Sequence, residues 1–305
     1  ESADYYADRY DAVRINRTSA LIGGRYVVTV DDTAFRSPHP LTWQAFTWPG
    51  ARTEGQRVVS EAGGEVRLDI IPGTGGTLAL TPIAKFPAYP CQGSTRVEFT
   101  LPAPAEQARL PMCLVPQPML RMEQDLTRGW SLHVDGRRLA SDIDLETYYL
   151  TDAVPPGSTL TFQRTVQVKD LQESGARVLR LRLAVPNVRL SVNGRPVHER
   201  YDQYPAFLQG QSQAFPHVYD LGDVLQAGEN TLTFALERWH GESLKVPVTL
   251  MAPCSLFIPA FAAKSATEFD VTLEGKADRL LLGNTGPVSW QGGHTDARHA
   301  LLTAD

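Results

Sequence analysis

Residues 177–236 read RVLRLRLAVPNVRLSVNGRPVHERYDQYPAFLQGQSQAFPHVYDLGDVLQAGENTLTFAL, and this stretch decides the fold. Apolar residues alternate with polar ones in Val178–Val185, Val188–Val192 and Thr231–Leu236. An alternation with a period of two is typical of a β-strand that buries one face. Asn193-Gly194 follows the second run and predicts a tight turn, because both residues tolerate a positive φ. We therefore expect antiparallel strands joined by turns.

A long polar loop that is rich in aromatic residues separates the second and third of these strands. Aromatic rings that cover the C–H patches of a sugar, with amides that hold its hydroxyls, suit a carbohydrate site. Long ordered loops also need aromatic anchors on their own domain, and the residues favour neither reading. The candidate substrate-binding residues are Tyr201, Tyr204, Phe207 and Gln209, with Trp239 and His240 after the last strand.

The rest of the chain carries short runs of the same kind. Arg25–Val30 is rich in β-branched residues, and we expect Asp31-Asp32 to end that strand. In Leu41–Trp48 the alternation puts Trp43 on one face and Trp48 on the other. Further runs lie at residues 65–71, 77–81, 94–101, 109–115, 130–135 and 160–168. Because no segment has a long, capped period of 3.6 residues, the predicted fold class is all-β.

Composition and charge narrow the classes of function. The chain has 305 residues, of which 42% are hydrophobic and 21% charged, and its formal net charge is -5. This balance shows no excess of the basic residues with which proteins bind nucleic acid. No apolar run reaches the roughly 18 residues of a membrane span. We therefore predict no nucleic-acid and no membrane partner. Cys91, Cys113 and Cys254 match no metal motif, and both buried thiols and one disulfide are compatible with them.

One resemblance rests on the stretch quoted first. Val192-Asn193-Gly194, Asp220–Leu225 and Gly228-Glu229-Asn230, with the strands around them, resemble the galactose-binding-like jelly roll that accompanies many glycosidases and polysaccharide lyases. This resemblance implies a jelly-roll β-sandwich over residues 119–255. It implies an association with carbohydrate and names no sugar, because fold and function separate easily.

A second resemblance lies in the flanking parts of the chain. Gly24–Asp32 with His39 and Leu41-Thr42-Trp43, then Arg96–Phe99 and Pro111–Pro116, are similar in order to the β-sandwich region of heparinase II/III-like polysaccharide lyases. Leu280–Asn284 with Thr295–Arg298 resembles the closing hairpin of that region. The fold implied is an antiparallel, lyase-type supersandwich formed by residues 1–118 and 256–305, into which the jelly roll is inserted.

The lyase resemblance also implies a function. Enzymes of that family abstract the C5 proton of a uronic acid, and an α-helical toroid carries most of their catalytic residues. We therefore expect this chain to be the β portion of such an enzyme. It would offer binding surface for a polysaccharide or oligosaccharide, with the toroid as a separate domain or subunit. The alternative is a non-catalytic carbohydrate-binding module or an accessory subunit of a glycosidase. A secreted or periplasmic location accompanies either reading.

His39 is the candidate catalytic residue in this comparison. It would neutralise the uronate carboxylate while Trp43 and Trp48 contact sugar. Asp32 and His39 are also candidate ligands of a divalent metal, the cofactor that this region suggests. The alternative is that the Asp pair favours a turn and that His39 is a surface residue.

Overall fold

The computed structural model describes residues 11–62, 66–83, 94–147, 154–155, 157–168, 177–182, 188–198, 216–236, 247–283, 288–290, 293–295, 297 and 299–303. Every regular element in these ranges is a β-strand and every strand pairing is antiparallel, which confirms the predicted all-β class. The chain divides into two compact units, Glu1–Met119 with Ser255–Asp305, and Leu120–Cys254. We expected the divisions after residues 118 and 255.

The first unit is built on a six-stranded sheet, called here the middle sheet. Its strands, in spatial order, are β1 (Ala12–Ile22), β2 (Tyr26–His39), β9 (Ala105–Pro118), β6 (Val66–Pro72), β5 (Arg57–Ala62) and β4 (Arg52–Glu54). Strand β9 lies between β2 and β6, so it joins the two halves of the sheet.

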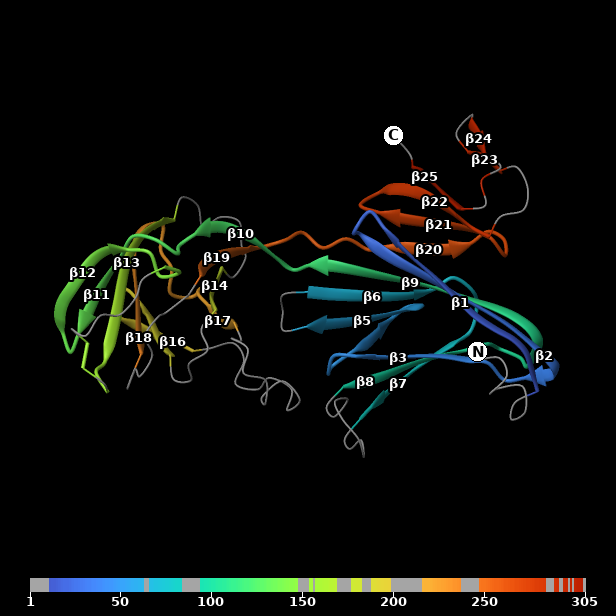
Figure 1. Ribbon diagram of the computed structural model, residues 1–305, viewed down its shortest axis with the longest axis horizontal. Coiled ribbons are helices and arrows are strands. Elements are labelled where there is room, and N and C mark those ends of the chain that lie inside the picture. Colours follow the sequence, from blue (N-terminus) through green and yellow to red (C-terminus); the bar gives the residue numbers. More distant parts are fainter. Residues whose placement is uncertain are drawn as a thin grey trace. The chain divides into compact units, whose positions relative to one another are not determined.

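Two further sheets of the first unit lie on opposite sides of the middle sheet (Figure 1). The outer sheet has the order β3 (Thr42–Thr47), β8 (Thr95–Thr100) and β7 (Thr77–Pro82). The C-terminal sheet has the order β20 (Ala260–Ala263), β21 (Glu268–Leu273), β22 (Lys276–Leu282) and β25 (His299–Thr303). A separate hairpin pairs β23 (Val288–Trp290) with β24 (Gly293–Thr295).

The middle sheet therefore buries apolar side chains on both faces. On β9, Leu110 and Met112 pack toward the outer sheet, whereas Cys113 and Val115 pack toward the C-terminal sheet. Alternation along a strand produces this division, because successive side chains point to opposite faces. The core against the C-terminal sheet unites strands from both ends of the chain: Tyr26, Val28, Val30, Ile71, Cys113 and Val115 with Phe261, Phe269, Val271, Leu273, Leu280 and Leu282.

Strand β2 is longer than the sequence predicts. We expected Asp31-Asp32 to end it, but β2 continues to His39. The two carboxylates point to opposite faces, and each is neutralised from β1: Arg17 binds Asp31 at 2.6 Å and Arg14 binds Asp32 at 2.8 Å. Cross-strand pairs of opposite charge stabilise an antiparallel sheet. The turn preference of an Asp pair is thus overridden by its partners on the neighbouring strand.

The second unit contains two antiparallel sheets. The six-stranded sheet has the order β12 (Arg137–Ile143), β11 (Trp130–Val134), β13 (Leu160–Val168), β18 (Gly228–Leu236), β15 (Val188–Val192) and β16 (Arg195–Val197). The four-stranded sheet has the order β10 (Leu120–Asp125), β19 (Val248–Pro253), β14 (Val178–Arg182) and β17 (Pro216–Asp220). One apolar core joins residues of both sheets, as expected for a β-sandwich.

An aromatic cluster forms the centre of this core. The rings of Phe162 and Phe234 stack with centroids 4.7 Å apart, and Trp130 meets Phe234 edge-on at 5.0 Å. All three side chains are fully buried. The indole nitrogen of Trp130 donates to the carbonyl of Leu126 at 2.5 Å, so its burial leaves no polar group without a partner.

The turn predicted at Asn193-Gly194 is present. Both residues have positive φ, 50° and 77°, as a tight hairpin turn between β15 and β16 requires. The side chain of Asn193 donates to the fully buried carboxamide of Asn230 at 3.0 Å. Asn230 in turn donates to the carbonyl of Gln226 at 2.7 Å. Two sequence motifs that lie 37 residues apart thus meet in one hydrogen-bonded cluster.

Candidate functional site

The structure places His39 at the end of β2, beside residues of its own strand. Its Nε2 lies 3.4 Å from the hydroxyl of Ser37, and its ring lies 4.9 Å from the ring of Phe35. Ser37 donates to Asp11 at 3.1 Å. The serine therefore stands between the carboxylate and the imidazole, and the carboxylate does not orient the imidazole as it would in a hydrolytic triad.

Asp32 and His39 are not brought together. The strand register places Asp32 opposite Arg109 and His39 opposite Ala105, so they are four residues apart along β9, or about 13 Å at ~3.3 Å per residue. Asp32 is instead engaged by Arg14, and no group of three His, Cys, Asp or Glu side chains suited to a metal occurs within the described ranges. The geometry gives no support to a shared metal site.

The two tryptophans predicted to contact sugar have different surroundings. Trp43 is only 5% exposed and belongs to the core between the middle and outer sheets. This corrects the expectation for Trp43, because a side chain inside a sandwich presents no surface to a ligand. Trp48 follows β3 on the opposite face and is 37% exposed. The alternation read from Leu41–Trp48 is therefore right, and its apolar side is the one with Trp43.

The outward surface of the outer sheet, called here the aromatic face, is the strongest candidate site. Phe46 precedes Trp48 by two residues, so both side chains leave the same side of β3, and Phe46 is 49% exposed. The other outward-facing residues of β3 and β8 are polar: Thr42, Gln44, Arg96, Glu98 and Thr100.

Cross-strand contacts hold the polar part of the aromatic face in place. Gln44 donates to Glu98 at 2.8 Å, and Arg96 pairs with Glu98 at 3.1 Å. The hydroxyls of Thr42 and Thr100 lie 2.9 Å apart. The strand register places Arg96 directly opposite Phe46. A flat row of fixed amide, carboxylate and guanidinium groups thus lies next to two exposed aromatic side chains.

Several of the predicted binding residues lie outside the described residues. These are Tyr201, Tyr204, Phe207, Gln209, Trp239 and His240. Their contribution to a sugar site stays a prediction.

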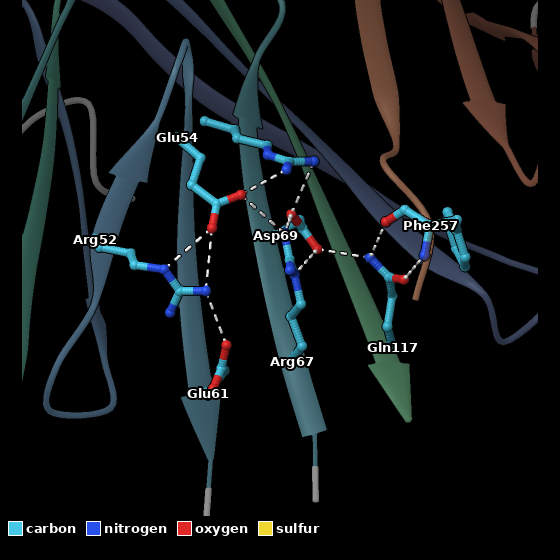
Figure 2. A network of polar contacts seen from close by, with 8 residues as sticks. Arg52, Glu54, Glu61, Arg67, Asp69, Gln117 and Phe257 are labelled. Carbon is cyan, nitrogen blue, oxygen red and sulfur yellow. Dashed lines mark hydrogen bonds and ion pairs between the residues drawn. The ribbon is translucent and has the colours of Figure 1, made fainter. Parts of the chain in front are cut away.

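A second polar assembly, the carboxylate network, lies on the middle sheet and serves packing (Figure 2). The fully buried carboxylate of Asp69 accepts from Arg67 at 3.1 Å and from Gln117 at 2.7 Å. The carboxamide of Gln117 also exchanges two hydrogen bonds with the backbone of Phe257, at 3.1 and 3.0 Å. Buried charges persist when they are paired in this way. Through Gln117, the network binds the segment around Phe257, which follows the second unit, to the middle sheet.

Cys113 lies in the core between the middle and C-terminal sheets and offers no reactive thiol there. Cys113 and Cys254 form no disulfide with each other, and Cys91 lies outside the described residues. Burial raises the pKa of the Cys113 thiol to about 12. A thiol that stays protonated at neutral pH is a poor nucleophile and a poor metal ligand.

Sequence reasoning missed Arg96 and Glu98 as site residues. Both belong to a run recognised as a strand, but their partner strand β3 lies more than 50 residues earlier in the chain. The signal that could have found them is the matching alternation of the two runs, in which each has an apolar side and a polar side. No periodicity specifies which two strands are neighbours.

No protein-family model matches this sequence, and no curated protein matches it. Among solved structures, the chain is similar to a β-glucuronidase from an uncultured Clostridium species, with 11% identity, a TM-score of 0.31 and coverage of 61% of this chain. It is also similar to a rhamnosidase from Novosphingobium sp. PP1Y, with 15% identity, a TM-score of 0.30 and coverage of 82% of this chain. The matched part spans 40% of the first protein and 26% of the second.

Proposed function

We propose that this chain is a carbohydrate-binding β protein and that the aromatic face holds the polysaccharide. The observation that carries the proposal is the pair of exposed aromatic side chains, Phe46 and Trp48, next to the ordered polar row of Gln44, Arg96 and Glu98. Contiguous exposed apolar surface rimmed by polar residues marks interaction sites, whereas apolar residues exposed singly are normal.

The chemistry of a sugar fits both halves of this surface. A pyranose ring has C–H patches that lose water favourably against an aromatic ring. It also carries hydroxyls that both donate and accept hydrogen bonds, which a carboxamide, a carboxylate and a guanidinium can satisfy together. The cross-strand bonds fix these groups before the ligand arrives, and this reduces the entropy lost on binding.

The finer proposal is that this surface belongs to a polysaccharide lyase of the heparinase II/III-like type. The resemblance of the strand motifs supports it, and Arg96 adds a cation that suits a uronate carboxylate. The proton-abstracting residues would then be supplied by an α-helical toroid. The second candidate is a binding module without chemistry of its own. It is favoured by Ser37, which stands between Asp11 and His39 and deprives His39 of a carboxylate that would orient it.

Affinity electrophoresis through gels that contain one polysaccharide each tests the proposal. The set should pair uronate polymers, such as alginate and hyaluronan, with neutral polymers. We expect retardation by at least one polymer. Trp48→Ala and Phe46→Ala should each weaken binding about tenfold or more, as expected for an aromatic anchor. Leu21→Ala is the matched control, because Leu21 is an exposed apolar residue of the middle sheet.

Two results would contradict the proposal. One is the absence of retardation by every polymer, and the other is wild-type retardation of both aromatic variants. Retardation by uronate polymers alone would favour the lyase assignment over a general module. The same gels can be read for unsaturated, ultraviolet-absorbing products. We expect the chain to bind without releasing them.

A further inference from the structure

We propose that a hollow on the middle sheet, on the face that lies toward the C-terminal sheet, is a second site and that it binds a carboxylate. The hollow, called here the arginine hollow, has a volume of about 380 Å³. Its lining residues are Arg14, Asp32, Gln107, Ala108 and Arg109. None of these residues belongs to the aromatic face.

Strand register explains how these side chains meet. Asp32 of β2 lies opposite Arg109 of β9, and Ala34 lies opposite both Arg14 of β1 and Gln107 of β9. The short side chain of Ala34 therefore lies between two long ones, which leaves room above the sheet. Asp32 continues the row of Val28 and Val30, so the hollow lies on the face that the C-terminal sheet covers further along β2.

The donors in the hollow are only partly used. Arg14 donates to Asp32 Oδ1 at 2.8 Å. Arg109 donates through Nη1 to the carbonyl of Ala266, which holds its guanidinium in place. Its Nε is buried, finds no hydrogen-bond acceptor among the described residues, and lies 3.9 Å from Asp32 Oδ2. A buried donor of a charged group without an acceptor is costly, and a ligand oxygen that reached this atom through a small shift of the guanidinium would remove that cost.

The charges select a carboxylate. Two guanidinium groups face one carboxylate, which leaves one net positive charge in the hollow. A carboxylate neutralises that charge and matches the planar donor edge of an arginine. A phosphate dianion would exceed the charge and would be repelled by Asp32. The Gln107 carboxamide can donate to a second ligand oxygen, a hydroxyl included.

Isothermal titration calorimetry on the full chain tests this proposal with three small ligands. Glucuronate carries the carboxylate on a sugar, succinate carries it without a sugar, and glucose is the neutral sugar. We expect saturable heat with glucuronate and none with glucose. Binding of succinate as well would show that the hollow recognises the carboxylate alone. No binding of succinate would show that it also recognises the sugar.

Variants of the lining residues sharpen the test. Arg109→Gln should weaken glucuronate binding about tenfold to a hundredfold, the usual consequence of losing a charge-assisted hydrogen bond. Asp32→Asn should strengthen binding, because the ligand then no longer competes with an internal carboxylate. Arg17→Gln is the matched control: Arg17 also lies on β1 and pairs with an aspartate, but on the opposite face of the sheet. Thermal melting should confirm that each variant is folded.

The proposal is wrong if neither wild type nor Asp32→Asn gives saturable heat with glucuronate, or if Arg17→Gln weakens binding as much as Arg109→Gln. Trp48→Ala separates this site from the aromatic face, since it should leave glucuronate binding in the hollow unchanged. Loss of glucuronate binding in Trp48→Ala with no effect of Arg109→Gln would move the ligand to the aromatic face and overturn the proposal.

Discussion

The two units of this chain bury their sheets in different ways. The second unit encloses one apolar core, centred on Trp130, Phe162 and Phe234, between two sheets. In the first unit the middle sheet has six strands and the C-terminal sheet that covers one of its faces has four. Polar groups, among them the buried carboxylate of Asp69, occupy the parts of that face beside the shared core. A face that is only partly covered thus has room for a network of charges, whereas the described part of the second unit buries a single charged side chain, Arg177, which pairs with Glu123 at 2.8 Å.

Loss of an aromatic ring from the second core should have the largest effect. Phe234→Ala removes a fully buried ring that contacts both Trp130 and Phe162, and we expect it to cost about 3–5 kcal/mol of unfolding free energy. Hydrogen exchange of backbone amides measures the effect separately in each unit. Protection should fall in β13 and β18 and stay unchanged in β6 and β9. An equal fall in both units would contradict the view that the two cores are independent. Leu139→Ala, at an exposed position of β12, is the control.

Removal of the central carboxylate should be the next largest effect, and it should appear in the first unit. Asp69→Ala leaves Arg67, Arg57 and Gln117 without their buried acceptor. We expect a loss of about 3 kcal/mol, the low end for a broken buried ion pair, because Glu54 still binds both arginines. Urea denaturation followed by amide exchange of β6 and β9 checks this. A loss below about 1 kcal/mol would show that water replaces the carboxylate readily.

The smallest effect should be a dependence on pH that is confined to the first unit. The hydrogen bond from Arg57, with the charges of Arg67 and Arg52, lowers the pKa of Glu54. A carboxylate with a lowered pKa stabilises the fold above its unfolded pKa of about 4.3, and this contribution is lost as the pH falls further. Glu54→Gln should therefore be less stable than wild type at pH 7, by about 1 kcal/mol or less.

The gap between the Glu54→Gln variant and wild type should close in acid. Amide exchange of β5 and β6 between about pH 3 and pH 7 measures it, over the interval in which a glutamate with a lowered pKa is titrated. Glu61→Gln is a useful second variant, because among the described residues Glu61 pairs only with Arg52 and does not contact Asp69. A gap that stays constant with pH would show that Glu54 acts through packing and not through its charge.

Local patterns in the sequence predicted much of the fold. Alternation in Leu41–Trp48 gave the two faces of β3 correctly, and Asn193-Gly194 gave a real turn. Both features depend on residues next to each other in the chain. The predicted end of β2 at Asp31-Asp32 was wrong. Both aspartates are stabilised within the strand by arginines of β1, which are distant in the sequence.

The candidate sites depend on strand neighbours, which the sequence does not specify. The arginine hollow needs β1, β2 and β9 side by side, and β9 begins more than 60 residues after β2 ends. Trp43 was expected to contact sugar from the lyase resemblance, and periodicity could not correct this, because it assigns two faces to a strand without saying which one is covered. Its burial follows from the packing of the outer sheet on the middle sheet.

The hydrogen bonds between Gln117 and Phe257 bear on how the chain folds while it is synthesised on the ribosome. They join residues 140 positions apart, and the intervening segment is the entire second unit. At about 5–20 residues per second, translation needs roughly 7–28 s to pass from one partner to the other. During that interval the apolar row of Cys113 and Val115 lacks the C-terminal sheet. The nascent middle sheet would then be a client for chaperones until the segment Ser255–Asp305 emerges and packs on it.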